Sequence, residues 1–375
     1  MKRNIRVLRG LVIATLAAAA AVTTGAQASI PYPTLARRIV TALAVERGER
    51  VLLRYDPATL GPLQPEVKAQ LEAKGAKVES LEYGPATDLA ARLARTDIYI
   101  WLPAGDRAET PADQRALLAK WLDEGRGRQI HFHWNGGTRD ADGLTVPHTP
   151  AYDPIYVAAL DIDYAILSRQ QDEAIARLRA GDVRVTTPDG TDLRFRVGDR
   201  PFNKQDGDAS KARMSTARTR VDREIELPAG VLRVAPIEST ANGVLVIPKA
   251  RFGDVIVTGA RLEITGGIVV KGSALTGNEA LQAFLKSAPG ASRFREFGLG
   301  FNPKLVVPAG STALPYYGYG DAVVRLSLGD NEEVGGEVRG GGVRWFFFPR
   351  ATVATGGTPL VTDGKLLRAI ASRTQ

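Results

Sequence analysis

The chain contains three histidines, and all of them lie between residues 131 and 148. His131 and His133 are two residues apart on an expected strand over 129–133, so their side chains leave the same face. That strand should be parallel to its neighbours, and ligands of open α/β sheets bind at the C-terminal ends of such strands. This placement suits a metal ion, with His148 as a third candidate ligand. The alternative is a hydrogen-bonded strand end without a metal.

Two glutamates stand out by their surroundings. Glu238 lies between two expected strands, and Glu296 follows Arg293 and Arg295 and precedes a glycine-rich segment. From periodicity alone, each would be a surface or helix-end acid. The chain has no cysteine and no G-x-S-x-G elbow, so the sequence shows neither a thiol nucleophile nor this serine motif.

The first half of the chain alternates short apolar runs with amphipathic segments, which is typical of βαβ units. We expect strands over 51–53, 77–81, 98–102 and 129–133, and helices over 65–74, 87–94 and 112–124. This pattern predicts a doubly wound parallel sheet, an α/β domain over residues 29–154. No G-x-G-x-x-G motif follows the first strand, so a dinucleotide-binding site is not supported.

A segment rich in Gly, Pro, Asp and Thr over 136–154 reads as a boundary loop. Residues 155–375 then form an expected α+β domain with mostly antiparallel strands. It would begin with a helix over 168–180 and end with a short helix over 365–372. Between them we expect a helix over 278–286 and strands over 183–187, 193–197, 231–235, 244–248, 255–257, 262–264, 268–271 and within 322–348.

The N-terminus is typical of an export signal. Residues 2–9 carry four basic residues and no acid, an apolar run follows over 11–22, and Ala26-Gln27-Ala28 is a signal-peptidase pattern. Cleavage before Ser29 predicts a periplasmic or secreted protein with no membrane anchor. It also lowers the formal net charge from +8 to +4. That ordinary value argues against a nucleic-acid or membrane partner.

Several short segments occur in an order that carries a family resemblance. They are Gly190-Thr191-Asp192-Leu193, Leu227-Pro228-Ala229-Gly230, Ala235-Pro236-Ile237-Glu238, residues 296–303, and residues 326–331 with Gly335-Gly336. This series resembles the aminopeptidase T family of metallopeptidases. The resemblance implies an α/β N-terminal domain, a C-terminal domain with a two-metal site, a homodimer, and release of N-terminal amino acids from peptides.

The resemblance also assigns a residue of this sequence to each metal-ligand position of the family. Glu238 and Glu296 match the two glutamates of the family. The first histidine falls on Arg325, and the later His-x-Asp pair falls on Arg344 and Phe346. A guanidinium has no lone pair to give and a phenyl ring has no ligand atom. Two fixed positive charges would also oppose divalent cations.

We therefore expect a degenerate peptidase site, a pseudoenzyme, with no metal cofactor. Glu238 and Glu296 would face Arg325 and Arg344 as ion pairs, or these arginines would bind a peptide carboxylate or another small anion. The alternative is an active aminopeptidase with two zinc, cobalt or manganese ions and rearranged ligands such as His131 and His133. A third possibility is an interaction protein of the cell envelope that uses the aromatic run 345–348.

Overall fold

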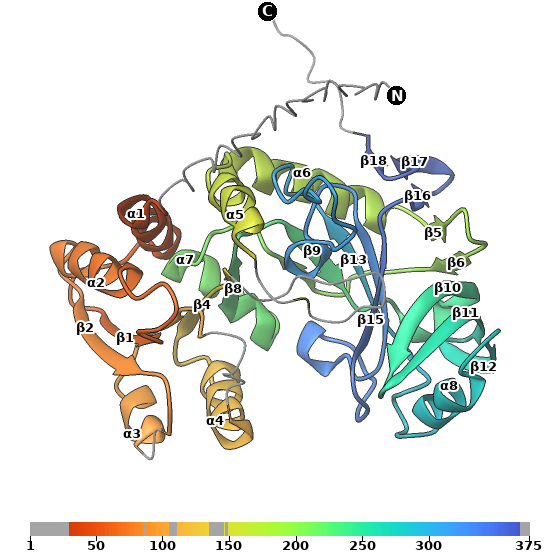
Figure 1. Cartoon of the computed structure of the whole chain (residues 1–375), viewed down its shortest axis with the longest axis horizontal. Helices are drawn as coiled ribbons and strands as arrows, with labels where there is room; N and C mark the ends of the chain where they lie inside the picture. The colour runs from red at the N-terminus through yellow and green to blue at the C-terminus, as the bar shows by residue number, and fades with distance from the viewer. Residues whose placement is uncertain (1–29, 86–87, 105–110, 135–145, 147–148, 368–375) are drawn as a thin grey trace, which may run out of the picture.

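The computed structural model describes residues 30–85, 88–104, 111–134, 146 and 149–367. Two domains lie side by side (Figure 1). No helix in the described part of the chain is long and apolar enough to cross a bilayer.

The N-terminal domain is built on a five-stranded sheet in the order β2-β1-β3-β4-β8, and every pair in it is parallel. Its strands are β1 (Arg50–Tyr55), β2 (Lys77–Glu82), β3 (Ile98–Trp101), β4 (Arg128–Phe132) and β8 (Glu224–Leu227). Its helices are α1 (Tyr32–Leu43), α2 (Leu63–Ala73), α3 (Leu89–Leu93) and α4 (Ala112–Asp123).

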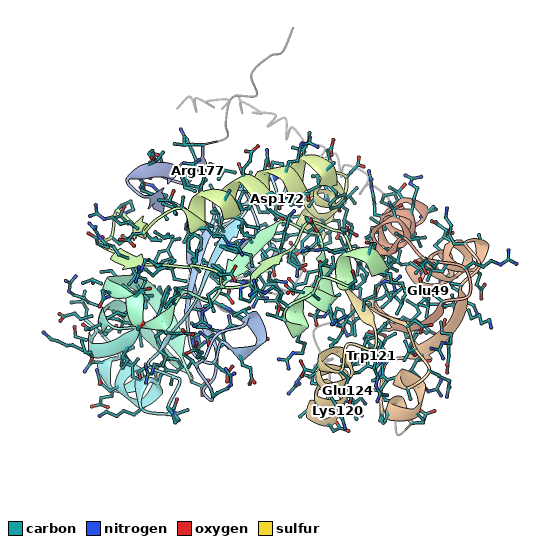
Figure 2. All side chains as sticks on the ribbon, turned by 180° about the vertical axis from the view of Figure 1, so that it is seen from behind. Glu49, Lys120, Trp121, Glu124, Asp172 and Arg177 are labelled. Carbon is teal, nitrogen blue, oxygen red and sulfur yellow. The ribbon has the colours of Figure 1, made fainter. Side chains whose placement is uncertain are left out.

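Alternate residues of these strands face opposite helix layers, as the period of two requires. Val51 and Leu53 of β1 belong to the main core with residues of α1 and α2. Leu52 instead packs in a second cluster with residues of α3 and with Trp121 of α4 (Figure 2). Helices therefore cover both faces, and the expected doubly wound α/β fold is confirmed.

The fifth strand of this sheet comes from far along the chain. β8 pairs with β4 and places Glu226 directly beside His131. The sheet therefore contains strands from both sides of the expected boundary between residues 154 and 155. Glu224-Ile225-Glu226-Leu227 alternates charged and apolar residues as a strand does, but nothing in the local pattern assigns it to the sheet of the first domain.

The C-terminal domain is α+β, with antiparallel pairing between its strands. One sheet has the order β12-β11-β10-β6-β5-β16-β17-β18 and the other has the order β15-β14-β13-β9-β7. The first contains β5 (Val183–Thr186), β6 (Asp192–Phe195), β10 (Asn242–Phe252), β11 (Val255–Thr265), β12 (Ile268–Ser273), β16 (Thr352–Thr355), β17 (Thr358–Thr362) and β18 (Lys365–Leu366). The second contains β7 (Phe202–Lys204), β9 (Val231–Val234), β13 (Phe294–Gly300), β14 (Val324–Leu328) and β15 (Arg344–Phe348).

The described helices of this domain are α5 (Asp153–Leu160), α6 (Tyr164–Arg179), α7 (Lys211–Met214) and α8 (Asn278–Leu285). Helix α6 begins four residues before the expected start, because the Asp163 side chain accepts a hydrogen bond from the Ile166 amide and caps the helix. The expected helix over 365–372 is wrong for its first residues. Lys365 and Leu366 form the edge strand β18 rather than a helix, and residues 368–372 lie outside the described residues.

Candidate functional site

The first candidate site lies where β4 and β8 end. The ligand atoms of His131, His133 and Glu226 all lie within 4.8 Å of one another. The two imidazole rings have centroids 4.0 Å apart. The sequence predicted the histidine pair but not Glu226, because β8 was not recognised. His148 lies outside the described residues.

Two hydrogen bonds orient this group. Nδ1 of His131 lies 3.2 Å from Oε1 of Glu224, two residues before Glu226 on β8. The Tyr319 hydroxyl donates to Oε2 of Glu226. Burial and the nearby Glu224 carboxylate raise the pKa of Glu226, while the positive charge of Arg233 acts against this rise.

Aromatic side chains form the walls around the histidines. The Trp101 ring meets the His131 ring edge-on, with centroids 4.4 Å apart. The rings of Tyr316 and Tyr317 lie 5.0 and 5.7 Å from that of His133. The N-terminal sheet therefore supplies the histidines, and a C-terminal segment closes over them.

The second candidate site surrounds Glu296 on β13, the middle strand of its sheet. Its carboxylate is fully buried, which corrects the expectation of a surface or helix-end acid. Arg325 donates to Oε1 through Nε and Nη2 at 3.1 and 2.7 Å, and Nη2 of Arg233 donates to Oε2 at 2.9 Å. Nη1 of Arg295 also contacts Oε2.

The strand register explains why these guanidiniums converge. Arg233 on β9 and Arg325 on β14 both pair with Gly298, which lies two residues from Glu296 and so on the same face. A Cβ atom at position 298 would lie 3.4 Å from both Cβ and Nε of Arg325. That distance is ordinary van der Waals contact, so it is the strand register that brings both arginines to the Glu296 carboxylate.

A second carboxylate completes this cluster. Oε1 of Glu333 accepts from Nη2 of Arg233 at 3.0 Å and also contacts Arg295. Burial alone would raise the pKa of Glu296, but the charges of Arg233, Arg295 and Arg325 outweigh it and hold this pKa well below its ordinary value.

Glu238 lies apart from that cluster in a short 3-10 turn (Glu238–Thr240). Its Oε2 accepts from Arg200 at 2.5 Å. Its Oε1 accepts from the Asn331 amide at 2.9 Å and from the Glu337 backbone at 2.8 Å. Both carboxylate oxygens are therefore held by the protein, and the principal cation is Arg200.

Of the ion pairs expected for Arg325 and Arg344, the structure confirms only the first. Arg325 faces Glu296 as expected. The Arg344 guanidinium instead lies over the rings of Phe252 and Phe284, at 5.4 and 5.8 Å from their centroids. Phe346 is buried beside Phe252. Arg344 begins β15 at the edge of the sheet, where the aromatic residues of β10 and α8 are its neighbours.

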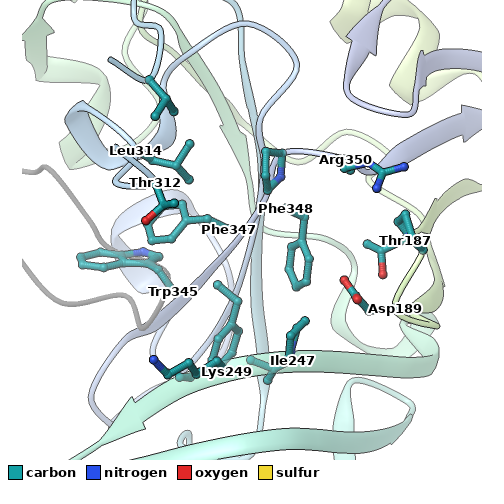
Figure 3. Close-up of a pocket in the computed structure, with 16 residues that line it drawn as sticks. Thr187, Asp189, Ile247, Lys249, Thr312, Leu314, Trp345, Phe347, Phe348 and Arg350 are labelled. Carbon is teal, nitrogen blue, oxygen red and sulfur yellow. The ribbon is translucent and has the colours of Figure 1, made fainter. Parts of the chain in front are cut away.

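A pocket of about 410 Å³ opens between β10, β15 and the segment 307–314 (Figure 3). Trp345, Phe347 and Phe348 supply its aromatic surface. Lys249 lies on one side of Phe348, and Asp189 and Arg350 lie on the other, where Nε of Arg350 donates to Asp363 at 3.0 Å. Trp345 also contacts the Tyr317 ring and the Arg325 guanidinium, so this pocket adjoins both candidate sites.

Fold and site together define a two-domain protein, with a parallel α/β domain and an antiparallel α+β domain joined by β8. Residues 167–308 match the family of thermophilic metalloproteases, M29. This match and the shared fold support a relationship with M29 aminopeptidase-like proteins. The expected family resemblance is confirmed to that extent. No curated protein sequence matches the chain.

Two solved structures share the fold. The first is 2,5-dihydroxypyridine dioxygenase from Pseudomonas putida KT2440, with a TM-score of 0.62 and 15% identity over 91% of this chain and 98% of that one. The second is wild-type AmpT from Thermus thermophilus, with a TM-score of 0.55 and 16% identity over 90% and 99%. The same architecture thus supports a peptidase-family protein and an oxygenase.

The surroundings of Glu296 do not fit a metal ion. Three guanidiniums bind its carboxylate, and one of them belongs to Arg325, where the family resemblance leads us to expect a histidine. A guanidinium cannot be a ligand, and its charge repels a cation.

Proposed function

We propose that this protein is an M29-related pseudoenzyme in which buried ion pairs replace the two-metal peptidase centre. One observation carries the proposal: the Glu296 carboxylate is bound by Arg233, Arg295 and Arg325 together. To bind a metal there, the protein would have to break several charge-assisted hydrogen bonds and leave guanidiniums buried without partners.

The charge balance of the cluster supports the same conclusion. Arg233, Arg295 and Arg325 face the two carboxylates of Glu296 and Glu333, and Arg220 adds a longer contact of 3.9 Å to Glu333, so positive charge is in surplus. Two divalent cations would add four more charges in a space of low dielectric, where repulsion is strong.

The remaining role that the geometry favours is binding. The aromatic pocket of Figure 3 suits an apolar side chain, and the ammonium group of Lys249 at its rim suits a carboxylate. A short peptide carries both groups, so we propose a short peptide or a similar carboxylate-bearing molecule as the ligand.

A peptide assay tests this proposal. The chain from Ser29 onward is incubated with leucyl dipeptides and with zinc, cobalt or manganese, and free amino acids are measured. We expect no release above a metal-only control, together with binding of intact dipeptide in calorimetry. Metal-dependent release that is lost in Glu238→Gln would overturn the pseudoenzyme, and absence of dipeptide binding would overturn the proposed ligand.

A metal-dependent aminopeptidase remains the second candidate, because His131, His133 and Glu226 offer ligands outside the M29 positions. Under this reading, dipeptide release would be lost in His133→Ala and retained in Glu238→Gln. Dipeptide release that is unchanged in both variants would exclude this second candidate.

We also propose that residues 1–28 direct export and that the mature protein is a homodimer. Fractionation of cells expressing the full chain tests export through removal of these residues from the periplasmic product. Light scattering of that product tests the dimer, and the mass of a single chain would contradict it.

A further inference from the structure

We propose that His131, His133 and Glu226 bind one divalent transition-metal ion at the C-terminal edge of the parallel sheet. This site is distinct from the M29 ligand positions in the other domain. The inference goes beyond the proposed peptide-binding role and does not depend on it.

The sheet itself positions the ligands. His131 and Glu226 are register partners on adjacent parallel strands, and His133 follows two residues later on the same face. Ligands at about 2.1 Å from a common ion lie at most roughly 4.2 Å apart, so small side-chain rotations close a set whose atoms now lie within 4.8 Å. A site on strand ends needs no folding of a loop before it can bind.

Neighbouring side chains hold the ligands in suitable orientations. With its Nδ1 hydrogen donated to Glu224, His131 keeps the lone pair of Nε2 for a metal. Metal-binding histidines are commonly oriented by a carboxylate in this way. The Tyr319 hydroxyl bonds one oxygen of Glu226 and leaves the carboxylate a second oxygen for the ion.

The segment that supplies Tyr319 is unusual. Tyr316 and Tyr317 both have left-handed backbones, with φ of 44° and 48°. This conformation is uncommon for non-glycine residues and is strained for bulky ones. It directs both rings toward His133 and places Tyr319 on Glu226.

The donor set selects the kind of ion. Two imidazoles and one carboxylate suit Zn²⁺, Co²⁺ or Fe²⁺, whereas Mg²⁺ and Ca²⁺ prefer oxygen ligands. Three protein ligands leave further coordination positions for water or another molecule, as in catalytic rather than structural sites.

Cobalt binding to the metal-free chain from Ser29 onward tests the proposal. Calorimetry and the visible Co²⁺ absorption are expected to report one ion per chain, displaced by Zn²⁺ and not by Mg²⁺. His133→Ala and Glu226→Gln should each weaken binding at least 100-fold. Two ions per chain, or unchanged binding in either variant, would overturn the site.

Two matched variants identify the ligands. Glu238→Gln changes an M29 position and His148→Ala removes the third histidine, and both should leave cobalt affinity unchanged. Loss of binding in Glu238→Gln would assign the ion to the M29 position instead. If cobalt affinity is lost in His148→Ala and retained in Glu226→Gln, His148 rather than Glu226 is the third ligand.

Tyr319→Phe separates positioning from folding. We expect cobalt affinity to fall 10- to 100-fold while the melting temperature of the metal-free protein changes little, because the ring remains and only the hydroxyl is lost. If His133→Ala does not fold, His131→Asn provides the same test with a side chain closer in size. Unchanged cobalt affinity in Tyr319→Phe would exclude this positioning role.

Discussion

At the scale of single residues, the balance of charge around Glu296 matters most. Its carboxylate accepts from three arginines, and two of them also bind Glu333. A buried ion pair adds little net stability over apolar packing, but removing one partner leaves an uncompensated charge. The two signs are unequal here, because three guanidiniums share two carboxylates and Arg220 also lies 3.9 Å from Glu333.

This inequality predicts an asymmetric response to substitution. Glu296→Gln leaves three guanidiniums with one carboxylate, and we expect it to lower the free energy of unfolding by about 3–5 kcal/mol. Arg325→Met leaves two guanidiniums with two carboxylates and an apolar side chain of similar length, so the loss should be clearly smaller. Urea unfolding of both variants measures the difference, and equal losses would contradict the surplus-charge argument.

At the scale of elements, a buried ion pair links two inner strands of the parallel sheet. Glu49, just before β1, accepts from both terminal nitrogens of Arg128 at the start of β4, at 2.7 and 2.8 Å (Figure 2 labels Glu49). Arg128 also donates to the carbonyl of Leu43, the last residue of α1. One buried pair thus links two strands and a helix.

This pair predicts a pH dependence of stability. Burial alone would raise the pKa of Glu49, but hydrogen bonds and the charge of Arg128 lower it below its ordinary value. Its stabilisation is therefore full above the unfolded pKa of about 4.3 and is lost as the pH falls through the lower folded pKa. Urea midpoints of the protein and of Glu49→Gln should differ at pH 7, and the difference should shrink as the pH falls below the unfolded pKa and vanish below the folded one. A difference in urea midpoint that does not change with pH would contradict the proposed role of the Glu49 carboxylate.

At the scale of the whole molecule, β8 couples the two domains. It lies at the edge of the N-terminal sheet, yet the chain enters it from β7 and leaves it for β9 of the C-terminal domain. Its residue Ile225 is fully buried in the main core, which contains residues of both domains. The proposed metal site also needs both domains, with Tyr319 supplied by the C-terminal one.

This coupling predicts cooperative unfolding. Ile225→Ala should destabilise the protein by about 2–5 kcal/mol, as expected for a buried isoleucine. Trp101, Trp121 and Trp134 report on the N-terminal domain and Trp345 on the C-terminal one. A variant that retains Trp345 alone should unfold at the same urea concentration as the protein followed by circular dichroism, and Ile225→Ala should shift both signals together. Separate transitions would contradict the coupling.

Much of the fold could be predicted from local patterns. The four strands over 50–55, 77–82, 98–101 and 128–132 and the helices between them follow from local apolar patterns, and the ion pair of Arg325 with Glu296 was expected from the ordered motifs. Local patterns are enough for these, because each helix buries one face and the inner strands of the sheet, buried on both faces, form short apolar runs.

The sequence alone determined the class of both domains and the histidine pair at the end of a strand. Tertiary structure decided the partners. The parallel pairing of β4 with β8 places Glu226 beside His131. The second sheet brings Arg233, Arg295 and Arg325 to Glu296, and Glu238 pairs with Arg200. The physical reason is that strand register and sheet order depend on the burial of the whole chain, which no local spacing encodes.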